Sequence, residues 1–397
     1  MSKKRKIHSR SYLMETYGER NLELVKGRGV YVYTKENKKY LDFGSGIAVN
    51  SLGHCHPKLV KSITNQSKKI WHTSNLYFNE KQEKYAKKIC TKTFADKVFF
   101  TNSGAEAIEC GIKIIRKYFF SKGLRKKNKI ITFNGAFHGR TITAISAQKN
   151  LKYSNGFGPL LKGFEQVLFN DIKSLKRKIK KDTAAILIET IQGEGGIRPV
   201  ELKYLKELRK ICNENNILLF IDEIQCGFGR SGKLFAYEWA KIKPDLVAVA
   251  KGIGSGFPMG ACLATEKVAQ YMTLGTHGST FGGNPLAIAV GETVIDIISK
   301  KNFLINVDKT SRYLWKELNK LKNDFKEILE IRGAGLLLGI KFTIPNNQIN
   351  KIFENNKLLT ICASDNIVRL APPLIIKIKH VDEAVRKIRR SLINYNN

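Results

Sequence analysis

The sequence predicts an α/β protein, with a large, mainly parallel sheet covered by helices and a smaller α+β region. Short apolar runs typical of buried strands alternate with helical segments from about residue 80 to residue 260, and such alternation indicates a parallel sheet. After Pro285 the pattern changes to helices followed by short strands. We therefore predict an amino-terminal segment over residues 1–60, a large domain over 61–285 and a small domain over 286–397, with the first segment completing the small domain.

Each expected element has a recognisable pattern. Residues 29–43 alternate aromatic and β-branched side chains around a polar turn, which predicts a hairpin. Apolar runs predict the other strands, and apolar spacing at three to four residues predicts the helices. We expect strands at residues 98–100, 130–133, 184–188, 217–221, 246–250, 336–342 and 368–370, and helices from near Ala105 and over residues 202–215, 287–299 and 312–322.

Composition excludes several classes of protein. A chain of 397 residues with 43% hydrophobic residues is too apolar to be disordered throughout. None of its apolar runs approaches the ~20 residues that span a bilayer, so we expect no membrane attachment. Its basic first residues lack the apolar core of a secretory signal. The seven cysteines include no Cys-x-x-Cys pair, which favours reduced thiols and a cytoplasmic location.

The net charge of +35 raises the question of nucleic-acid binding. Lysines are spread along the whole chain, as in the helical stretch 173–181, and they strongly outnumber arginines. The aromatic and glycine-rich signatures of RNA-binding modules are absent from the sequence. We interpret the charge as a lysine-rich solvated surface and expect no nucleic-acid partner.

Two neighbouring strands each end in an ionisable side chain. The run 217–221 leads into Asp222, and the run 246–250 leads into Lys251. Open α/β sheets bind their ligands at the carboxyl ends of the strands. A lysine and a carboxylate at this edge suit pyridoxal phosphate, whose aldehyde reacts with an amine and whose ring nitrogen is paired with an acid. We therefore predict a pyridoxal phosphate site.

Three other strand ends carry polar or glycine-rich segments. Residues 101–107 join a strand to a helix through small residues, an arrangement that suits a phosphate but is common in simple helix caps. Residues 133–140 offer Phe137 for stacking on a planar ring and Arg140 for a carboxylate. Glu189 ends a further apolar strand and is expected to face the same crevice as Asp222.

Two motifs are rejected. Residues 227–232 match Gly-x-Gly-x-x-Gly, but no clear helix follows and the expected ribose-binding acid is missing. Residues 54–56 read His-Cys-His without a second ligand cluster, so we expect a loop and predict no metal site. The glycine-rich loop 275–285 carries hydroxyls that can reach a phosphate, although nothing local says whose phosphate it is.

Taken together, these segments resemble the class III aminotransferases of fold type I. The likeness extends from Tyr17 to about Leu374 and includes motifs at residues 39–57, 103–106, 137–140, 222–225, 250–252 and 277–285. Two departures are Thr190, where a proline is common, and Cys226, where a threonine is common. The resemblance implies a seven-stranded, mainly parallel sheet in the large domain and a smaller domain built from both ends of the chain.

The resemblance also implies roles around the cofactor. Lys251 is expected to bond covalently to the cofactor and later to shuttle the substrate proton, while Asp222 keeps the ring nitrogen protonated. Gln225 is expected to hydrogen-bond the phenolic oxygen. Phe137 is expected to cover one ring face.

The implied phosphate site combines two subunits. Ser103, Gly104 and Ala105 supply phosphate contacts within one chain. Thr280 is expected to reach the phosphate of the neighbouring subunit, which implies a homodimer with shared active sites.

The implied substrates are N2-acetylornithine and 2-oxoglutarate, with glutamate as a product, as in arginine biosynthesis. Arg140 and Ser279 are expected to hold the distal carboxylate of the first substrate. Arg369 is expected to bind the carboxylate beside the reacting carbon of the second, and Glu189 to pair with Arg369 and mask it during the first half-reaction. Tyr17 is a further expected substrate contact.

Three alternatives remain open at this point. Another donor of the same class, such as succinyldiaminopimelate, ornithine, succinylornithine or 4-aminobutyrate, shares most of these motifs. An aminomutase uses the same fold without 2-oxoglutarate. A basic nucleic-acid-binding protein is the alternative from another class, and salt-dependent duplex binding would identify it.

Overall fold

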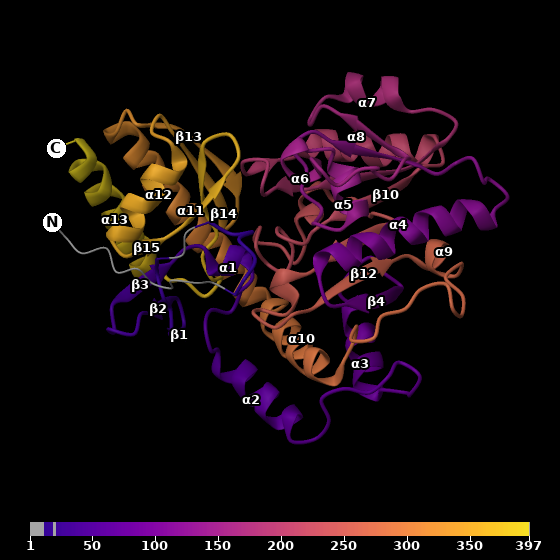
Figure 1. Ribbon diagram of the computed structural model, residues 1–397, viewed down its shortest axis with the longest axis horizontal. Coiled ribbons are helices and arrows are strands. Elements are labelled where there is room, and N and C mark those ends of the chain that lie inside the picture. The colour runs from indigo at the N-terminus through magenta and orange to yellow at the C-terminus, as the bar shows by residue number, and fades with distance from the viewer. Residues whose placement is uncertain (1–11, 19–20, 397) are drawn as a thin grey trace.

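The computed structural model describes residues 12–18 and 21–396 and contains two groups of elements side by side (Figure 1). The basic residues 1–10 lie outside the described part. The strands are β1 (Lys26–Arg28), β2 (Tyr31–Tyr33), β3 (Lys39–Asp42), β4 (Lys97–Thr101), β5 (Lys129–Phe133), β6 (Phe164–Val167), β7 (Thr183–Glu189), β8 (Ile191–Gln192), β9 (Arg198–Pro199), β10 (Leu218–Asp222), β11 (Leu246–Val249), β12 (Gly260–Ala264), β13 (Ile328–Ala334), β14 (Leu337–Phe342), β15 (Leu358–Leu359), β16 (Ile361–Ala363) and β17 (Ile367–Leu370).

The helices follow the same order along the chain. They are α1 (Ser45–Ala48), α2 (Pro57–Ser67), α3 (Glu80–Cys90), α4 (Gly104–Ser121), α5 (Ile142–Gln148), α6 (Leu151–Ser154), α7 (Ile172–Lys178), α8 (Leu202–Glu214), α9 (Glu266–Ala269), α10 (Pro285–Ile298), α11 (Lys301–Asp324), α12 (Asn346–Asn355) and α13 (Ile378–Asn396), with short 3₁₀ turns η1 (Ala236–Ala240) and η2 (Lys251–Ile253).

The predicted large sheet is confirmed. Its strand order is β4-β12-β11-β10-β7-β5-β6, which makes seven strands. The pairs β11–β10, β10–β7, β7–β5 and β5–β6 are parallel, whereas β12 runs antiparallel to both of its neighbours. The ends of β7, β10 and β11 therefore meet at one edge, as predicted for Glu189, Asp222 and Lys251.

Successive residues of β10 pack on opposite faces of this sheet. Leu218 and Phe220 join the apolar cluster under α4, while Leu219 and Ile221 join the cluster that contains α8. Gly111 lets α4 approach closely, because a Cβ atom there would lie 2.2 Å from the ring of Phe220. This close packing fixes the start of α4 relative to the end of β10, and so positions the site.

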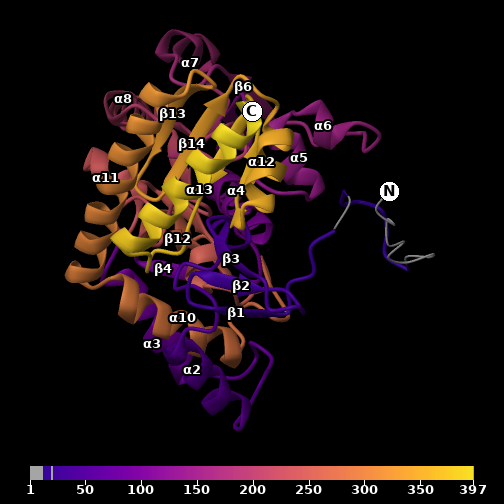
Figure 2. The same ribbon diagram turned by 90° about the vertical axis from the view of Figure 1, so that its left-hand side faces the viewer.

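Elements from the amino-terminal and carboxyl-terminal parts of the chain, β1–β3 and β13–β17, lie together in the second of these groups (Figures 1 and 2). The hairpin β2–β3 is extended by β1 on one side and by the carboxyl-terminal strand β15 on the other. A second sheet has the order β13-β14-β17-β16. This arrangement supports the proposed small domain built from both ends, while the boundaries at residues 60 and 285 stay predictions.

Several elements differ from the sequence prediction. Helix α11 begins at Lys301 instead of near residue 312, and β12 carries no pattern that singles it out, because its five residues include no β-branched side chain. Among residues 12–18 and 21–396, none of the helices is long and apolar enough to cross a membrane.

Candidate active site

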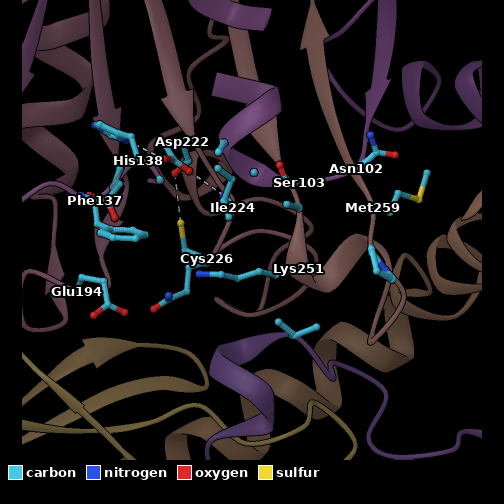
Figure 3. Close-up of a pocket in the computed structure, with 18 of the residues that line it drawn as sticks. Asn102, Ser103, Phe137, His138, Glu194, Asp222, Ile224, Cys226, Lys251 and Met259 are labelled. Atoms are coloured by element: carbon cyan, nitrogen blue, oxygen red, sulfur yellow. Dashed lines mark hydrogen bonds and ion pairs between the residues drawn. The ribbon is translucent and has the colours of Figure 1, made fainter. Parts of the chain in front are cut away.

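A pocket of about 370 Å³ opens at the carboxyl edge of the large sheet (Figure 3). Its wall includes the ends of β7, β10 and β11, the start of α4 and the loop after β5. Figure 3 shows Phe137, Glu194, Asp222 and Lys251 around one space. The residues that the sequence assigns to a cofactor therefore come together, apart from Thr280.

Asp222 is a buried carboxylate held by two hydrogen bonds. Its side chain is 3% exposed, and its Oδ1 accepts from the Ile224 backbone N–H at 3.0 Å. Its Oδ2 lies 2.8 Å from Nδ1 of His138. Burial lowers the pKa of His138, but hydrogen bonding and the charge of Asp222 outweigh it and raise that pKa. Asp222 is therefore held in place by His138 and the Ile224 amide, in a position where it can face a protonated ring nitrogen.

His138 is a site residue that the sequence analysis missed. It is 1% exposed, its backbone N–H donates to Gln148 Oε1 at 2.9 Å, and its Nε2 has no partner among the described residues. An indication of this role was present in the sequence, because His138 lies inside the motif 137–140. Only its distance to Asp222, which is 84 residues away, reveals its part in the site.

Lys251 is the second residue after the end of β11, and its side chain lines the pocket. Its backbone is in the left-handed region (φ 49°), a costly conformation for a residue with a side chain. Burial, followed by the charge of Arg369, lowers the pKa of its amine to about 8, against the opposing charges of Glu194, Asp222 and Glu189. A substantial fraction of the amine is thus neutral and nucleophilic near neutral pH.

The start of α4 forms a cradle suited to a phosphate. Ser103 caps the helix by accepting from the Glu106 N–H at 3.2 Å. The first amides of a helix have no acceptor within it and carry the positive end of its dipole. Gly104 is required by close packing, since a Cβ atom there would lie 2.7 Å from the Ile224 side chain. Gly104 and Ala105 both line the pocket, and their contact with a phosphate stays a prediction.

Glu189 supports the loop that carries Phe137. Its Oε2 accepts from the Phe137 N–H at 3.0 Å and its Oε1 from the Gly193 N–H at 3.4 Å. Burial raises the pKa of Glu189 to about 8, and the charge of Asp222 acts in the same direction. Glu189 lines the pocket, but both of its carboxylate oxygens accept hydrogen bonds from backbone N–H groups.

The predicted pairing of Glu189 with Arg369 is wrong. Arg369, 1% exposed on β17, lies 2.8 Å from Oε1 of Glu194 and donates to Oε1 of Gln225 at 2.9 Å. The reason is that Glu189 ends β7 and faces the Phe137 loop, whereas Glu194 lies beyond the turn that follows and reaches the small domain. Glu194 is the second site residue that the sequence analysis missed, although it stands in the same quoted segment as Glu189.

The remaining predicted residues lie outside the pocket wall. Arg140 is exposed and stacks on Tyr153, with its guanidinium carbon 4.1 Å from the ring centroid. Ser279 accepts from Asn102 Nδ2 at 3.2 Å, which ties the loop 275–285 to the edge of the site. Thr280 and Tyr17 are exposed, and Tyr17 is 77% accessible. Their roles in substrate or cofactor binding remain predictions.

The residues present fit pyridoxal phosphate. The pocket combines unpaired helix amides, a buried acid, an aromatic side chain and an amine of lowered pKa. The Nε of Arg369 is buried without a partner among the described residues, which suits a site that binds anionic substrates. Within residues 12–18 and 21–396, no three His, Cys, Asp or Glu side chains are grouped so as to hold a metal ion. At residues 54–56, His54 Nε2 contacts Asp42 Oδ2 at 2.7 Å and His56 caps α2.

Comparison with known proteins agrees with this site. The model of the class-III aminotransferases matches residues 14–392. Acetylornithine aminotransferase of Mesorhizobium japonicum is 50% identical over 382 residues, covering 96% of each chain, and that of Clostridium acetobutylicum is 47% identical over 97% of this chain and all of its own length.

Solved structures give the same result. The N-acetylornithine aminotransferase of Stenotrophomonas maltophilia superimposes with a TM-score of 0.84 at 34% identity, covering 95% of this chain and 97% of its own. An ornithine aminotransferase of Toxoplasma gondii reaches a TM-score of 0.93 at 30% identity, covering 97% and 93%. With its sheet order, its Asp222 and Lys251 at adjoining strand ends and a family match over nearly its whole length, this chain belongs to the class III aminotransferases.

Proposed function

We propose that this protein is a pyridoxal phosphate-dependent N2-acetylornithine aminotransferase of arginine biosynthesis. It transfers the terminal amine of N2-acetylornithine to 2-oxoglutarate and forms N-acetylglutamate semialdehyde and glutamate. The observation that carries the proposal is the 50% identity to an acetylornithine aminotransferase over 96% of both chains.

The side chains of the pocket suit the proton transfers of this reaction. Pyridoxal phosphate supplies an aldehyde that bonds to amines and a ring that accepts electrons. Asp222, fixed by His138, holds a proton on the ring nitrogen. The Lys251 amine takes the proton from the reacting carbon of the substrate. Phe137 lines the pocket, where it would cover one face of the ring and help exclude water.

Arg369 and Glu194 let one pocket accept two differently charged substrates. The carbon that bears the reacting amine of N2-acetylornithine carries no carboxylate. An unpaired arginine at this position would therefore attract the carboxylate at the far end of the donor. Glu194 neutralises Arg369 at 2.8 Å in the state described. When 2-oxoglutarate or glutamate enters, its carboxylate replaces Glu194 as the partner of Arg369.

Glu194→Ala is expected to shift donor preference. Without the competing carboxylate, Arg369 is available to the α-carboxylate of glutamate-like donors at all times. We expect kcat/KM for glutamate relative to N2-acetylornithine to rise roughly tenfold, equivalent to about 1.4 kcal/mol. Steady-state kinetics with both donors measures this ratio.

Glu189→Ala is the matched control for that variant. Because Glu189 holds the Phe137 loop and does not pair with Arg369, its removal should lower both activities without changing their ratio. A ratio that changes in Glu189→Ala and stays constant in Glu194→Ala would contradict the assignment.

The lowered pKa of Lys251 predicts how cofactor attachment depends on pH. Only the neutral amine reacts with the aldehyde, and its fraction rises as pH approaches a pKa of about 8. We expect the initial rate of attachment to apoprotein to rise roughly tenfold per pH unit well below that value and to level off above it. Borohydride trapping followed by mass mapping measures the rate, and a midpoint near 10 would contradict the prediction.

We also propose a homodimer in which the loop 275–285 completes the neighbouring site. Large apolar side chains are exposed on this loop, at the residue just before it and on the segment before α3. They are Trp71, Leu76, Tyr77, Phe78, Leu274 and Phe281. Asn75 Nδ2 donates to the Ser279 carbonyl at 3.0 Å, so the two segments form one surface. An apolar surface of this kind is typical of subunit interfaces.

Subunit mixing tests the shared site. Lys251→Ala and Thr280→Ala each remove a group from every site of a homodimer. If Thr280 serves the partner's phosphate, a mixed dimer has one site with both defects and one with neither, so co-refolded subunits recover activity. If each chain completes its own site, mixing restores nothing.

The cysteines support the proposed cytoplasmic location. All seven are free thiols in this structure. Such a set is typical of proteins kept in a reducing compartment.

A donor panel tests the proposed substrate. N2-acetylornithine, ornithine, N-succinyldiaminopimelate and 4-aminobutyrate are compared at fixed 2-oxoglutarate, and omission of 2-oxoglutarate tests for an aminomutase. We expect the highest kcat/KM with N2-acetylornithine. Ornithine is the main competitor, given the TM-score of 0.93 to an ornithine aminotransferase, and a preference for it would overturn the substrate assignment but not the family.

A further inference from the structure

A second cavity, of about 360 Å³, lies on the α4 face of the large sheet and shares none of its lining residues with the cofactor pocket. Two cysteines face it from different elements, Cys110 from α4 and Cys262 from β12. Each is 1% exposed to bulk solvent. This cavity is therefore lined by two thiols that take no part in transamination.

The two thiols lie beside a basic pair. Cys110, Cys262 and His277 line the same cavity, and the pKa of Cys110 responds to both of these neighbours. Nδ1 of His277 lies 2.9 Å from Nζ of Lys113, and its ring packs on Phe99 with centroids 4.6 Å apart. The arrangement is a thiol held between a second thiol and an imidazole, with an ammonium group behind it.

These neighbours make the two sulfurs unequal. The hydrogen bond from Cys262, followed by that from His277 and the charges of His277 and Lys113, lowers the pKa of Cys110 in spite of burial. The same contact raises the pKa of Cys262. An attacking thiolate beside a protonated thiol is the arrangement found in redox-active cysteine pairs. By contrast, Cys212 is equally buried, and burial raises its pKa to about 12.

We propose that Cys110 and Cys262 form a redox-active thiol pair that a hydroperoxide converts to a disulfide. The Cys110 thiolate attacks the peroxide oxygen, so that an S–O bond forms, the O–O bond breaks, and hydroxide leaves and becomes water on protonation. Cys262 then gives up its proton and attacks the Cys110 sulfur, which forms the S–S bond and releases the second oxygen as water. Two thiols lose two electrons, and the peroxide is reduced to two waters.

The bond would join two elements that begin at the cofactor pocket. Helix α4 starts at Gly104 in the phosphate cradle, and β12 starts immediately after Met259 in the pocket wall. His277 belongs to the loop that carries Ser279 and Thr280. A disulfide between them would therefore link α4 to β12 next to the site without using a residue of the cofactor pocket.

Peroxide titration of the holoenzyme tests the proposal. The Cys55→Ser background removes the exposed thiol. Substoichiometric hydrogen peroxide is followed by alkylation and peptide mapping. We expect a linked peptide containing Cys110 and Cys262, lighter by two hydrogens and separated again by dithiothreitol, before any oxidation of Cys212. In Cys262→Ser the product at Cys110 should be a sulfenic acid, which dimedone traps.

Alkylation kinetics test the environment of the thiol separately. Cys110 is expected to react with iodoacetamide at least roughly tenfold faster than Cys212 at neutral pH. Lys113→Ala, at an exposed position, should lower the alkylation rate of Cys110 and leave the alkylation rate of Cys212 unchanged. The proposal is overturned if Cys110 and Cys212 react with iodoacetamide at the same rate. It is also overturned if, in the peroxide titration, Cys110 and Cys262 stay reduced after Cys90 and Cys362 have been oxidised. Because these measurements do not depend on turnover, they are independent of the substrate assignment.

Discussion

Replacing Lys251 with alanine is expected to abolish nearly all transamination, lowering kcat/KM by about 10⁴-fold. The loss has two causes. Lys251 is the amine of lowered pKa in the pocket, so the variant loses the covalent attachment of the cofactor. It also loses the base that is expected to take the proton from the reacting carbon.

Lys251→Ala is measured alongside Lys203→Ala, an exposed lysine on α8 far from the pocket. Both variants should unfold near the wild-type temperature, because Lys251 forms no ion pair among the described residues and alanine keeps the Cβ atom that this left-handed backbone already accommodates. Only Lys251→Ala should lose the borohydride-stable cofactor adduct. Retention of wild-type turnover, or an adduct on another lysine, would contradict the assignment.

The sequence predicted the strand ends of this site correctly because their signals are local. An apolar run that stops at Asp222 or Lys251 indicates a strand end, and the parallel order brings such ends to one edge. Helix α4 and its cap were equally readable, since Ser103 followed by small residues is a local pattern. The resemblance supplied the chemistry, and the comparisons agree with it.

The contacts that the sequence did not reveal join distant parts of the chain. His138 and Asp222 are 84 residues apart. Whether Glu189 or Glu194 pairs with Arg369 depends on the direction in which the turn after β7 points each carboxylate. The sequence does not show this turn, so it does not distinguish two acids that are five residues apart. The contact of Cys110 with Cys262 likewise depends on how α4 packs on β12, an antiparallel strand without a sequence signal.

The second large effect is expected from Asp222→Ala, which should lower kcat/KM by about 10³-fold. Its carboxylate is buried and lines the pocket, where it would stabilise a positive charge on the ring nitrogen of the bound cofactor. Without that charge the ring accepts electrons poorly, so the loss should appear in kcat more than in KM. Single-turnover kinetics of each half-reaction measures the effect.

Asp222→Asn separates charge from shape in this prediction. The amide keeps the size of the carboxylate and can still accept one hydrogen bond, but it provides no negative charge for the ring nitrogen. It should therefore be nearly as inactive as the alanine variant. An asparagine variant with near-wild-type activity would show that the Asp222 carboxylate is structural.

His138 offers a way to test how Asp222 is held. The imidazole lies 2.8 Å from the carboxylate and fixes its direction, so His138→Asn should cost roughly 10- to 100-fold, which is typical of a group that orients another. If His138 acts only through Asp222, its replacement should cost almost nothing further in an Asp222→Ala background. Additive losses in this double-mutant cycle would show that His138 contributes separately, and the unpaired Nε2 of its ring would then be the atom to investigate.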